Sequence, residues 1–121
     1  MINITYVEDS RRPERNEEFK AIIKKSDFAD NVEYTSSIDI KYYQQLETNG
    51  IVCHSGMDGF NIIKHFAKEK GWPILTYSGS SDCLPTMKKN PFAKHYFSVH
   101  CDYFEKVLPE FIQYCSDKFK V

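Results

Sequence analysis

Hydrophobic and polar positions along the chain follow two alternating periods. Short runs rich in apolar and β-branched residues are typical of strands. Five such runs lie at Ile2–Val7, Asn31–Thr35, Ile51–His54, Ile74–Tyr77 and His95–Val99. Between them, apolar residues recur at spacings of three and four, which predicts helices with one buried face. These helices are expected at Arg11–Lys25, Ser37–Asn49, Asp58–Gly71 and Asp82–Asn90, with a last one opened by Asp102.

Residues suited to starting and stopping helices lie at the borders of these segments. Ser10 can cap the first helix, and Pro13 falls in its first turn, where a missing N–H does no harm. Pro109 lies inside the last pattern and predicts a kink or a later start. Strands that alternate with helices are typical of βαβ units, whose right-handed crossovers place helices on both faces of a parallel sheet. The sequence therefore predicts one α/β domain over residues 1–121.

Composition excludes some classes of partner and compartment. Charged residues make up 27% of the chain and the formal net charge is −1, so no general attraction to nucleic acid or to an anionic membrane is expected. No apolar run approaches the roughly 20 residues that span a bilayer, and the first residues do not resemble a secretory leader. The four cysteines have no paired spacing, which favours reduced thiols. We therefore expect a cytoplasmic protein.

Polar residues follow several of the predicted strands directly. In a parallel sheet, the carboxyl ends of the strands form the functional edge. The residues expected there are Glu8, Asp9, His54, Ser55, Ser78 and His100.

Four segments, taken in order, resemble the receiver domain of bacterial response regulators. They are "ITYVEDS", "MDGF", "PILTYSGSSD" and "HYFSVHCDYFEKVLPEFI", and together they extend over nearly the whole chain. The resemblance implies a flavodoxin-like fold, which is a single doubly wound five-stranded parallel sheet with strand order 2-1-3-4-5 and helices on both faces.

The same resemblance implies a role for individual residues. A receiver accepts a phosphoryl group on a carboxylate that ends the third strand, with Mg²⁺ held by an acidic pair and that carboxylate. Glu8 and Asp9 match the acidic pair, Ser78 matches the hydroxyl residue, and Tyr96 matches the aromatic residue that rotates when the domain switches. His54 falls at the acceptor position.

Two parts of the receiver chemistry are missing from this sequence. The acceptor position holds His54, or Ser55 if the register slips, and neither forms the acyl phosphate that a carboxylate forms. The position of the family's lysine falls near Val99, and the usual proline after it is replaced by His100. We therefore expect a degenerate, pseudo-receiver form without ordinary aspartyl phosphorylation.

A domain of this kind is expected to act in signal transduction through protein contacts, with a protein partner or as a homodimer, and not as an enzyme. No cofactor is expected. In receivers, the surface formed by the fourth helix, the fifth strand and the last helix binds partners. The residues expected to form this interaction face are Met87, Phe92, Tyr96 and Tyr103.

Two alternatives remain at the level of sequence. The first is an active but atypical receiver in which Mg²⁺ on Glu8 and Asp9 assists phosphorylation of another residue. The second is a small metal-binding or hydrolytic enzyme that uses His54 and His100, with neighbouring cysteines as ligands of the type that zinc prefers. One strand separates those two histidines, a distance of about 10 Å, which weakens the second alternative. Asp58 is expected to cap a helix. The partner's identity, and whether the chain is part of a longer protein, stay open.

Overall fold

The computed structural model describes residues 2–79, 86–90 and 94–120. Four α-helices are described, and they are α1 (Pro13–Lys25), α2 (Ile40–Gln45), α3 (Phe60–Lys70) and α4 (Phe104–Phe119). The strands of the sheet are β1 (Ile4–Val7), β2 (Val32–Thr35), β3 (Gly50–His54), β4 (Ile74–Ser78), β5 (Lys88–Lys89) and β6 (Tyr96–His100). Short 3₁₀ turns precede β2 (η1, Ala29–Asn31) and α4 (η2, Cys101–Tyr103).

The strands form one sheet in the order β2-β1-β3-β4-β6-β5, and all pairs are parallel except β5 with β6. The predicted α/β class with a mostly parallel sheet is confirmed. The prediction of five strands in the order 2-1-3-4-5 is wrong, because β5 adds an antiparallel strand at one edge. None of the helices that the structure describes is long and apolar enough to cross a membrane.

The extra strand lies inside a segment for which the sequence predicts a helix. Lys88 and Lys89 pair with Ser98 and Phe97, and the N–H of Asn90 donates to the carbonyl of Tyr96 over 2.8 Å. Both lysine side chains are exposed, so the strand is stabilised by backbone pairing to β6 and not by a buried face. The helix predicted over Asp82–Asn90 is therefore wrong for its last residues, and its first four residues lie outside the described part of the chain.

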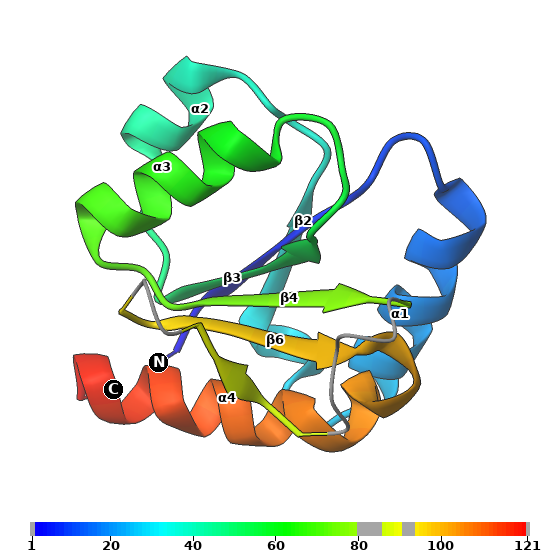
Figure 1. Cartoon of the computed structure of the whole chain (residues 1–121). Coiled ribbons are helices and arrows are strands. Elements are labelled where there is room, and N and C mark those ends of the chain that lie inside the picture. Colours follow the sequence, from blue (N-terminus) through cyan, green and yellow to red (C-terminus); the bar gives the residue numbers. More distant parts are fainter. Residues whose placement is uncertain (1, 80–85, 91–93, 121) are drawn as a thin grey trace.

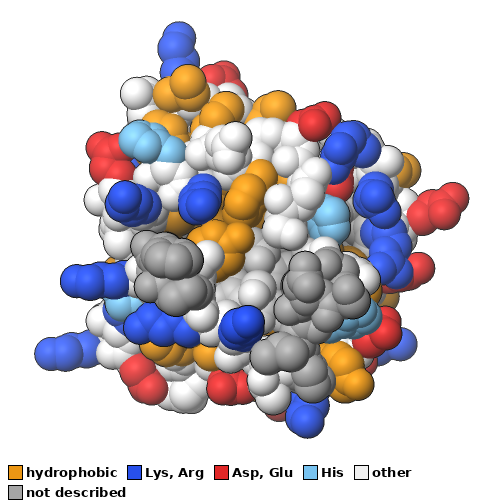
Figure 2. Space-filling model, viewed as in Figure 1, with side chains coloured by type: hydrophobic (Ala, Val, Ile, Leu, Met, Phe, Trp, Pro, Cys, Tyr) orange, Lys and Arg blue, Asp and Glu red, His pale blue; other side chains and the backbone are white. Residues whose placement is uncertain are grey.

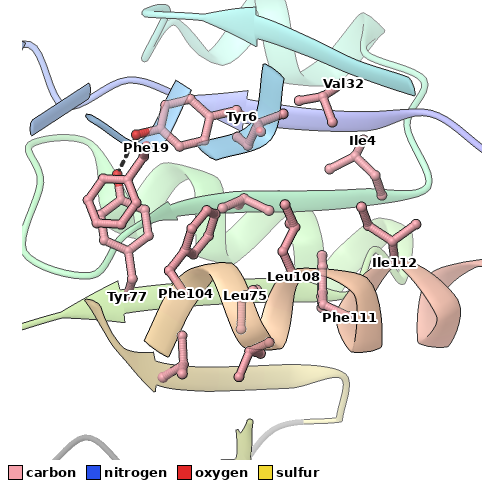
Figure 3. Packing of buried hydrophobic residues seen from close by; sticks show 14 of the residues in the cluster. Ile4, Tyr6, Phe19, Val32, Leu75, Tyr77, Phe104, Leu108, Phe111 and Ile112 are labelled. Atoms are coloured by element: carbon pink, nitrogen blue, oxygen red, sulfur yellow. Dashed lines mark hydrogen bonds between the residues drawn. The ribbon is translucent and has the colours of Figure 1, made fainter. Parts of the chain in front are cut away.

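Helices cover both faces of the sheet, with α1 and α4 on one side and α2 and α3 on the other (Figure 1). Each face has its own apolar cluster. The cluster beneath α1 and α4 is drawn in Figure 3 and includes Ile4, Tyr6, Phe19, Leu75, Tyr77, Phe104, Leu108, Phe111 and Ile112. The cluster beneath α2 and α3 includes Val7, Tyr43, Ile51, Cys53, Ile63, Phe66 and Trp72. Strands covered on both sides explain the nearly continuous apolar runs in the sequence.

Two helices differ from their predicted form. The last helix begins at Phe104 and continues through Pro109, so the expected later start is wrong. Helix α2 has six residues. The apolar residues Ile40, Tyr43 and Leu46 recur at spacings of three, which predicts one buried face, but Ile40 is 51% exposed. Only Tyr43 of the expected face is fully buried. So short a helix covers little of the sheet.

Candidate functional site

A buried side-chain amide fixes the loop between β1 and α1. Asn16, in the first turns of α1, accepts from the Asp9 N–H over 3.0 Å and donates to the Asp9 carbonyl over 2.7 Å. Its oxygen also accepts from the hydroxyl of Tyr6. Both Asp9 and Asn16 are buried, so these bonds replace water that the Asp9 backbone has lost. They hold the Asp9 carboxylate at the carboxyl edge of the sheet.

A guanidinium group neutralises this carboxylate. The Arg11 Nε lies 3.3 Å from Asp9 Oδ1, and the Arg11 backbone N–H also donates to that oxygen. The same guanidinium donates to the carbonyl of Gly56 and lies 3.7 Å from Asp58 Oδ1. Burial raises the pKa of Asp9, but the hydrogen bonds from Arg11 outweigh it, and the pKa ends below its usual value. Asp9 is therefore ionised at neutral pH with Arg11 as its counter-ion.

The other member of the acidic pair faces a different cation. Glu8 forms an ion pair with Lys20 of α1, and Lys20 also lies over the ring of Tyr34. A divalent cation shared by Glu8 and Asp9 needs both carboxylates to be available for its oxygen-rich shell. Each carboxylate already has its own basic side chain. A Mg²⁺ ion shared by Glu8 and Asp9 would therefore require both ion pairs to open.

His54 ends β3 next to Asp9 and is neutral. Its Nδ1 accepts from the Gly56 N–H over 3.2 Å, which leaves the ring proton on Nε2. Partial burial, together with three nearby arginines, lowers the pKa of His54 even though Asp9 opposes this effect. The 3.5 Å between His54 Nδ1 and Asp9 Oδ2 is consequently a contact between two acceptors and not an ion pair at neutral pH.

Two tyrosine hydroxyls meet beneath this site. The Tyr6 and Tyr77 hydroxyl oxygens are 2.6 Å apart, and the two rings are stacked. A dashed line in Figure 3 marks this hydrogen bond. Burial raises the pKa of both tyrosines, so they stay protonated at any ordinary pH. Because Tyr6 also donates to Asn16, the hydroxyls form a chain that connects β4 to the Asp9 loop.

A cavity of about 320 Å³ opens beside these groups. It lies where α1, β3, β4 and the turn after β6 come together. The lining residues are Asp9, Arg12, Arg15, Asn16, His54, Tyr77, Ser78, Gly79 and Cys101. The sequence predicts three of these, Asp9, His54 and Ser78, at the functional edge.

The two residues expected to act in a receiver switch lie at opposite ends of the sheet. Ser78 ends β4 and pairs with His100, whereas Tyr96 begins β6 and pairs with Ile74. Four residue steps separate the two positions along the strand, a distance of about 13 Å at about 3.3 Å per residue. The ring of Tyr96 packs edge-on against Phe60 and beneath Lys64 of α3.

The three described residues of the expected interaction face are also dispersed. Tyr96 packs against the cluster under α2 and α3, while Met87 packs against the cluster under α1 and α4. Tyr103 is 42% exposed and lies in η2 at the other end of β6, with its ring edge-on to His100. Phe92 lies outside the described residues.

Among the residues that the structure describes, Cys53 and His54 do not form one ligand group with His100 and Cys101. Cys53 is fully buried, and burial raises the pKa of its thiol, which opposes the thiolate that zinc binds. In the described part of the chain, one group, His100, Cys101 and Asp102, has possible ligand atoms within 4.8 Å of one another. His100 Nδ1 there accepts from the Asp102 N–H, and Cys101 Sγ accepts from Arg15, so hydrogen bonds already account for both atoms.

Sequence reasoning missed the basic and amide residues that define this site. None of Arg11, Arg12, Arg15 and Asn16 is predicted as a site residue from the sequence. Their position in the sequence could have indicated a role, because they closely follow the acidic pair and lie at the start of the first predicted helix. Asp58, expected as a helix cap, makes no such bond, since Gly59 is the N-cap of α3.

No protein-family model matches this chain, and neither curated proteins nor solved structures show a significant match to it.

Proposed function

We propose that this chain is a receiver-like signalling or regulatory module that acts through protein contacts and without ordinary aspartyl phosphorylation. One observation carries the proposal. The Asp9 carboxylate is buried, ionised and paired with Arg11, and the neighbouring strand end holds the neutral His54 where a receiver needs an acceptor carboxylate. Phosphoryl transfer to a carboxylate has neither its acceptor nor a free metal-binding pair at this place.

A groove beside α3 supports the part of the proposal that concerns contacts. It has a volume of about 700 Å³, with Trp72, Ile74 and Tyr96 among its lining residues. Lys64, Lys68 and Lys94 also line it. Figure 2 shows apolar side chains flanked by basic ones on this side of the molecule. Aromatic residues with basic neighbours are typical of the anchor regions of protein interfaces, and the charges favour an acidic partner segment or an acidic patch on a second copy.

The chemical half of the proposal is tested with Mg²⁺ and a small phosphodonor such as acetyl phosphate, followed by intact-protein mass spectrometry. No phosphate adduct is expected on the wild-type chain. A stoichiometric adduct that disappears in His54→Ala would contradict the proposal, and so would an adduct on any carboxylate.

The contact half is tested by affinity capture and by sedimentation of the purified chain. Tyr96→Ala combined with Lys68→Glu changes the groove, while Lys24→Glu on the opposite face is the matched control. We expect the groove variant to lose a partner, or self-association, that the wild type and the control both retain. Equal behaviour of all three proteins would refute a role for the groove.

The two alternatives have less support. Mg²⁺ at Glu8 and Asp9 requires the ion pairs with Lys20 and Arg11 to open. A metal-dependent or hydrolytic activity of His54 with His100 requires two residues that end strands β3 and β6, which β4 separates.

A further inference from the structure

The cavity beside Asp9 has the size and the lining of a small-molecule site. Its volume of about 320 Å³ is at the lower end of the roughly 300–1,000 Å³ that ligand pockets enclose. A ligand there is therefore small. The walls come from α1, β3, β4 and the turn after β6, so the groups that line it are brought together only by the fold.

The charge of the lining favours an anion. Arg12 and Arg15 face one carboxylate, Asp9, and that carboxylate already has Arg11 as its counter-ion outside the cavity lining. His54 is neutral and keeps its Nε2–H as a donor. Among the lining residues themselves the charge is thus positive, and Glu18, which pairs with Arg15, lies outside the lining.

Among the residues that line the cavity, Arg12 has the guanidinium group that is most available to bind an anion. Its guanidinium makes no hydrogen bond or ion pair with any residue in the described part of the chain, and it lines the cavity. Arg15 is positioned by Glu18 at 3.0 Å and by the Cys101 Sγ at 3.2 Å, which holds its guanidinium at the cavity wall and leaves further N–H donors. The planar guanidinium fork matches the paired oxygens of a carboxylate or a phosphate.

We propose that this cavity binds a small organic anion non-covalently, a carboxylate or a phosphate ester, through Arg12 and Arg15, with the His54 Nε2–H as a further donor. Such a ligand would give the domain an input signal that needs no phosphorylated residue. This proposal does not depend on the proposed function, because it concerns non-covalent binding through Arg12 and Arg15 and not phosphorylation or contacts with a protein partner.

Cys101 provides a probe inside the cavity. Its thiol is partly buried in the lining, while Cys53 and Cys115 are fully buried and Cys83 lies outside the described residues. Iodoacetate and iodoacetamide alkylate a thiolate by the same displacement of iodide and are close in size, but only iodoacetate is an anion. The ratio of their rates at the Cys101 peptide, measured by mass spectrometry, therefore reports whether the cavity attracts an anion.

We expect the iodoacetate-to-iodoacetamide ratio at Cys101 to be at least about fivefold higher in the folded chain than in the urea-unfolded chain, the effect of roughly one net hydrogen bond. Arg12→Gln should bring the ratio back near the unfolded value, whereas Lys24→Gln, which removes an equal charge from the far end of α1, should leave it unchanged. Arg12 is exposed, so the variant should fold.

A second measurement identifies the preferred anion. Amide NMR spectra are recorded while inorganic phosphate or acetate is added at constant ionic strength. Shifts for Gly79 and Cys101 that saturate with phosphate indicate a phosphate ester, and saturation with acetate indicates a carboxylate. A folded chain with no anion preference at Cys101 would overturn the proposal, and so would a preference that survives in Arg12→Gln. Neither result would change the outcome expected from the phosphodonor experiment.

Discussion

Replacing Asn16 by alanine should destabilise the fold more than a typical substitution. The side chain makes two hydrogen bonds with the Asp9 backbone and accepts one from Tyr6, and all three groups are buried. Two backbone bonds contribute about 1 kcal/mol each, and an unsatisfied buried N–H adds roughly 1–3 kcal/mol. Water that enters from the cavity offsets part of this. We expect a loss of about 3 kcal/mol in the free energy of unfolding, out of a total of roughly 5–15 kcal/mol.

Urea unfolding measures this change through the fluorescence of Trp72, the one tryptophan of the chain, which is 6% exposed. Gln113→Ala is the control, because among the described residues that amide bonds only to Asp117 on the exposed side of α4, and the change should alter stability by less than about 0.5 kcal/mol. A loss below about 1 kcal/mol for Asn16→Ala would refute the role assigned to its amide.

Asn16→Asp separates hydrogen bonding from packing. The carboxyl keeps the size of the amide but cannot donate to the Asp9 carbonyl when ionised. Burial raises the pKa of such a group, so the variant should be more stable at pH 5 than at pH 8 and should lose stability as the pH rises. A pH profile like that of the wild type would show that water hydrates the introduced carboxylate, so that burial does not raise its pKa.

Three further results are expected. Arg11→Ala removes the counter-ion while burial of Asp9 remains, so the pKa of Asp9 should rise. In the wild type, the stability that this carboxylate contributes is present above its unfolded pKa and is lost as the pH falls through the lower folded pKa, whereas the variant should lose stability as the pH rises through the raised folded pKa. Urea unfolding between pH 3 and pH 8 checks the sign of this change. An unchanged slope would contradict this. Gly59→Ala should cost roughly 1–3 kcal/mol, because φ is +80° and a Cβ would meet a side-chain carbon at 2.5 Å, while Gly79→Ala, whose nearest atom is at 3.9 Å, should be tolerated. Equal costs would show that the chain relaxes around Gly59. Cys115 should resist alkylation until the chain unfolds, because it is fully buried and burial raises its pKa to about 12. Rapid modification in the native state would refute its placement in the core.

The parallel core of the fold was predictable because it depends on local patterns. The apolar runs at β1, β3 and β4 are buried on both faces of the sheet. In the helix that begins at Pro13, the buried residues recur at spacings of three and four. The edge strand was not predictable in the same way. Lys88 and Lys89 carry no apolar alternation, and their conformation follows from hydrogen bonds to β6, which lies later in the chain.

The candidate site shows the same division. Asp9 and His54 were expected together at the carboxyl edge, because parallel strands end on the same side. Their ionisation states depend on the direction of neighbouring side chains and on contacts between segments distant in sequence. The Arg11 guanidinium, for example, donates to the carboxylate of the nearby Asp9 and to the carbonyl of the distant Gly56. A pattern of residue types does not specify such contacts.

The sequence by itself determined the α/β class, the strand and helix order of the parallel part, and the residues that reach the functional edge. Only the tertiary structure decided that Glu8 and Asp9 are each neutralised by a separate cation, and that a cavity forms beside Arg12. The physical reason is that hydrophobic periodicity is read along the chain, while charge pairing and cavity shape depend on which side chains the packed strands and helices bring together.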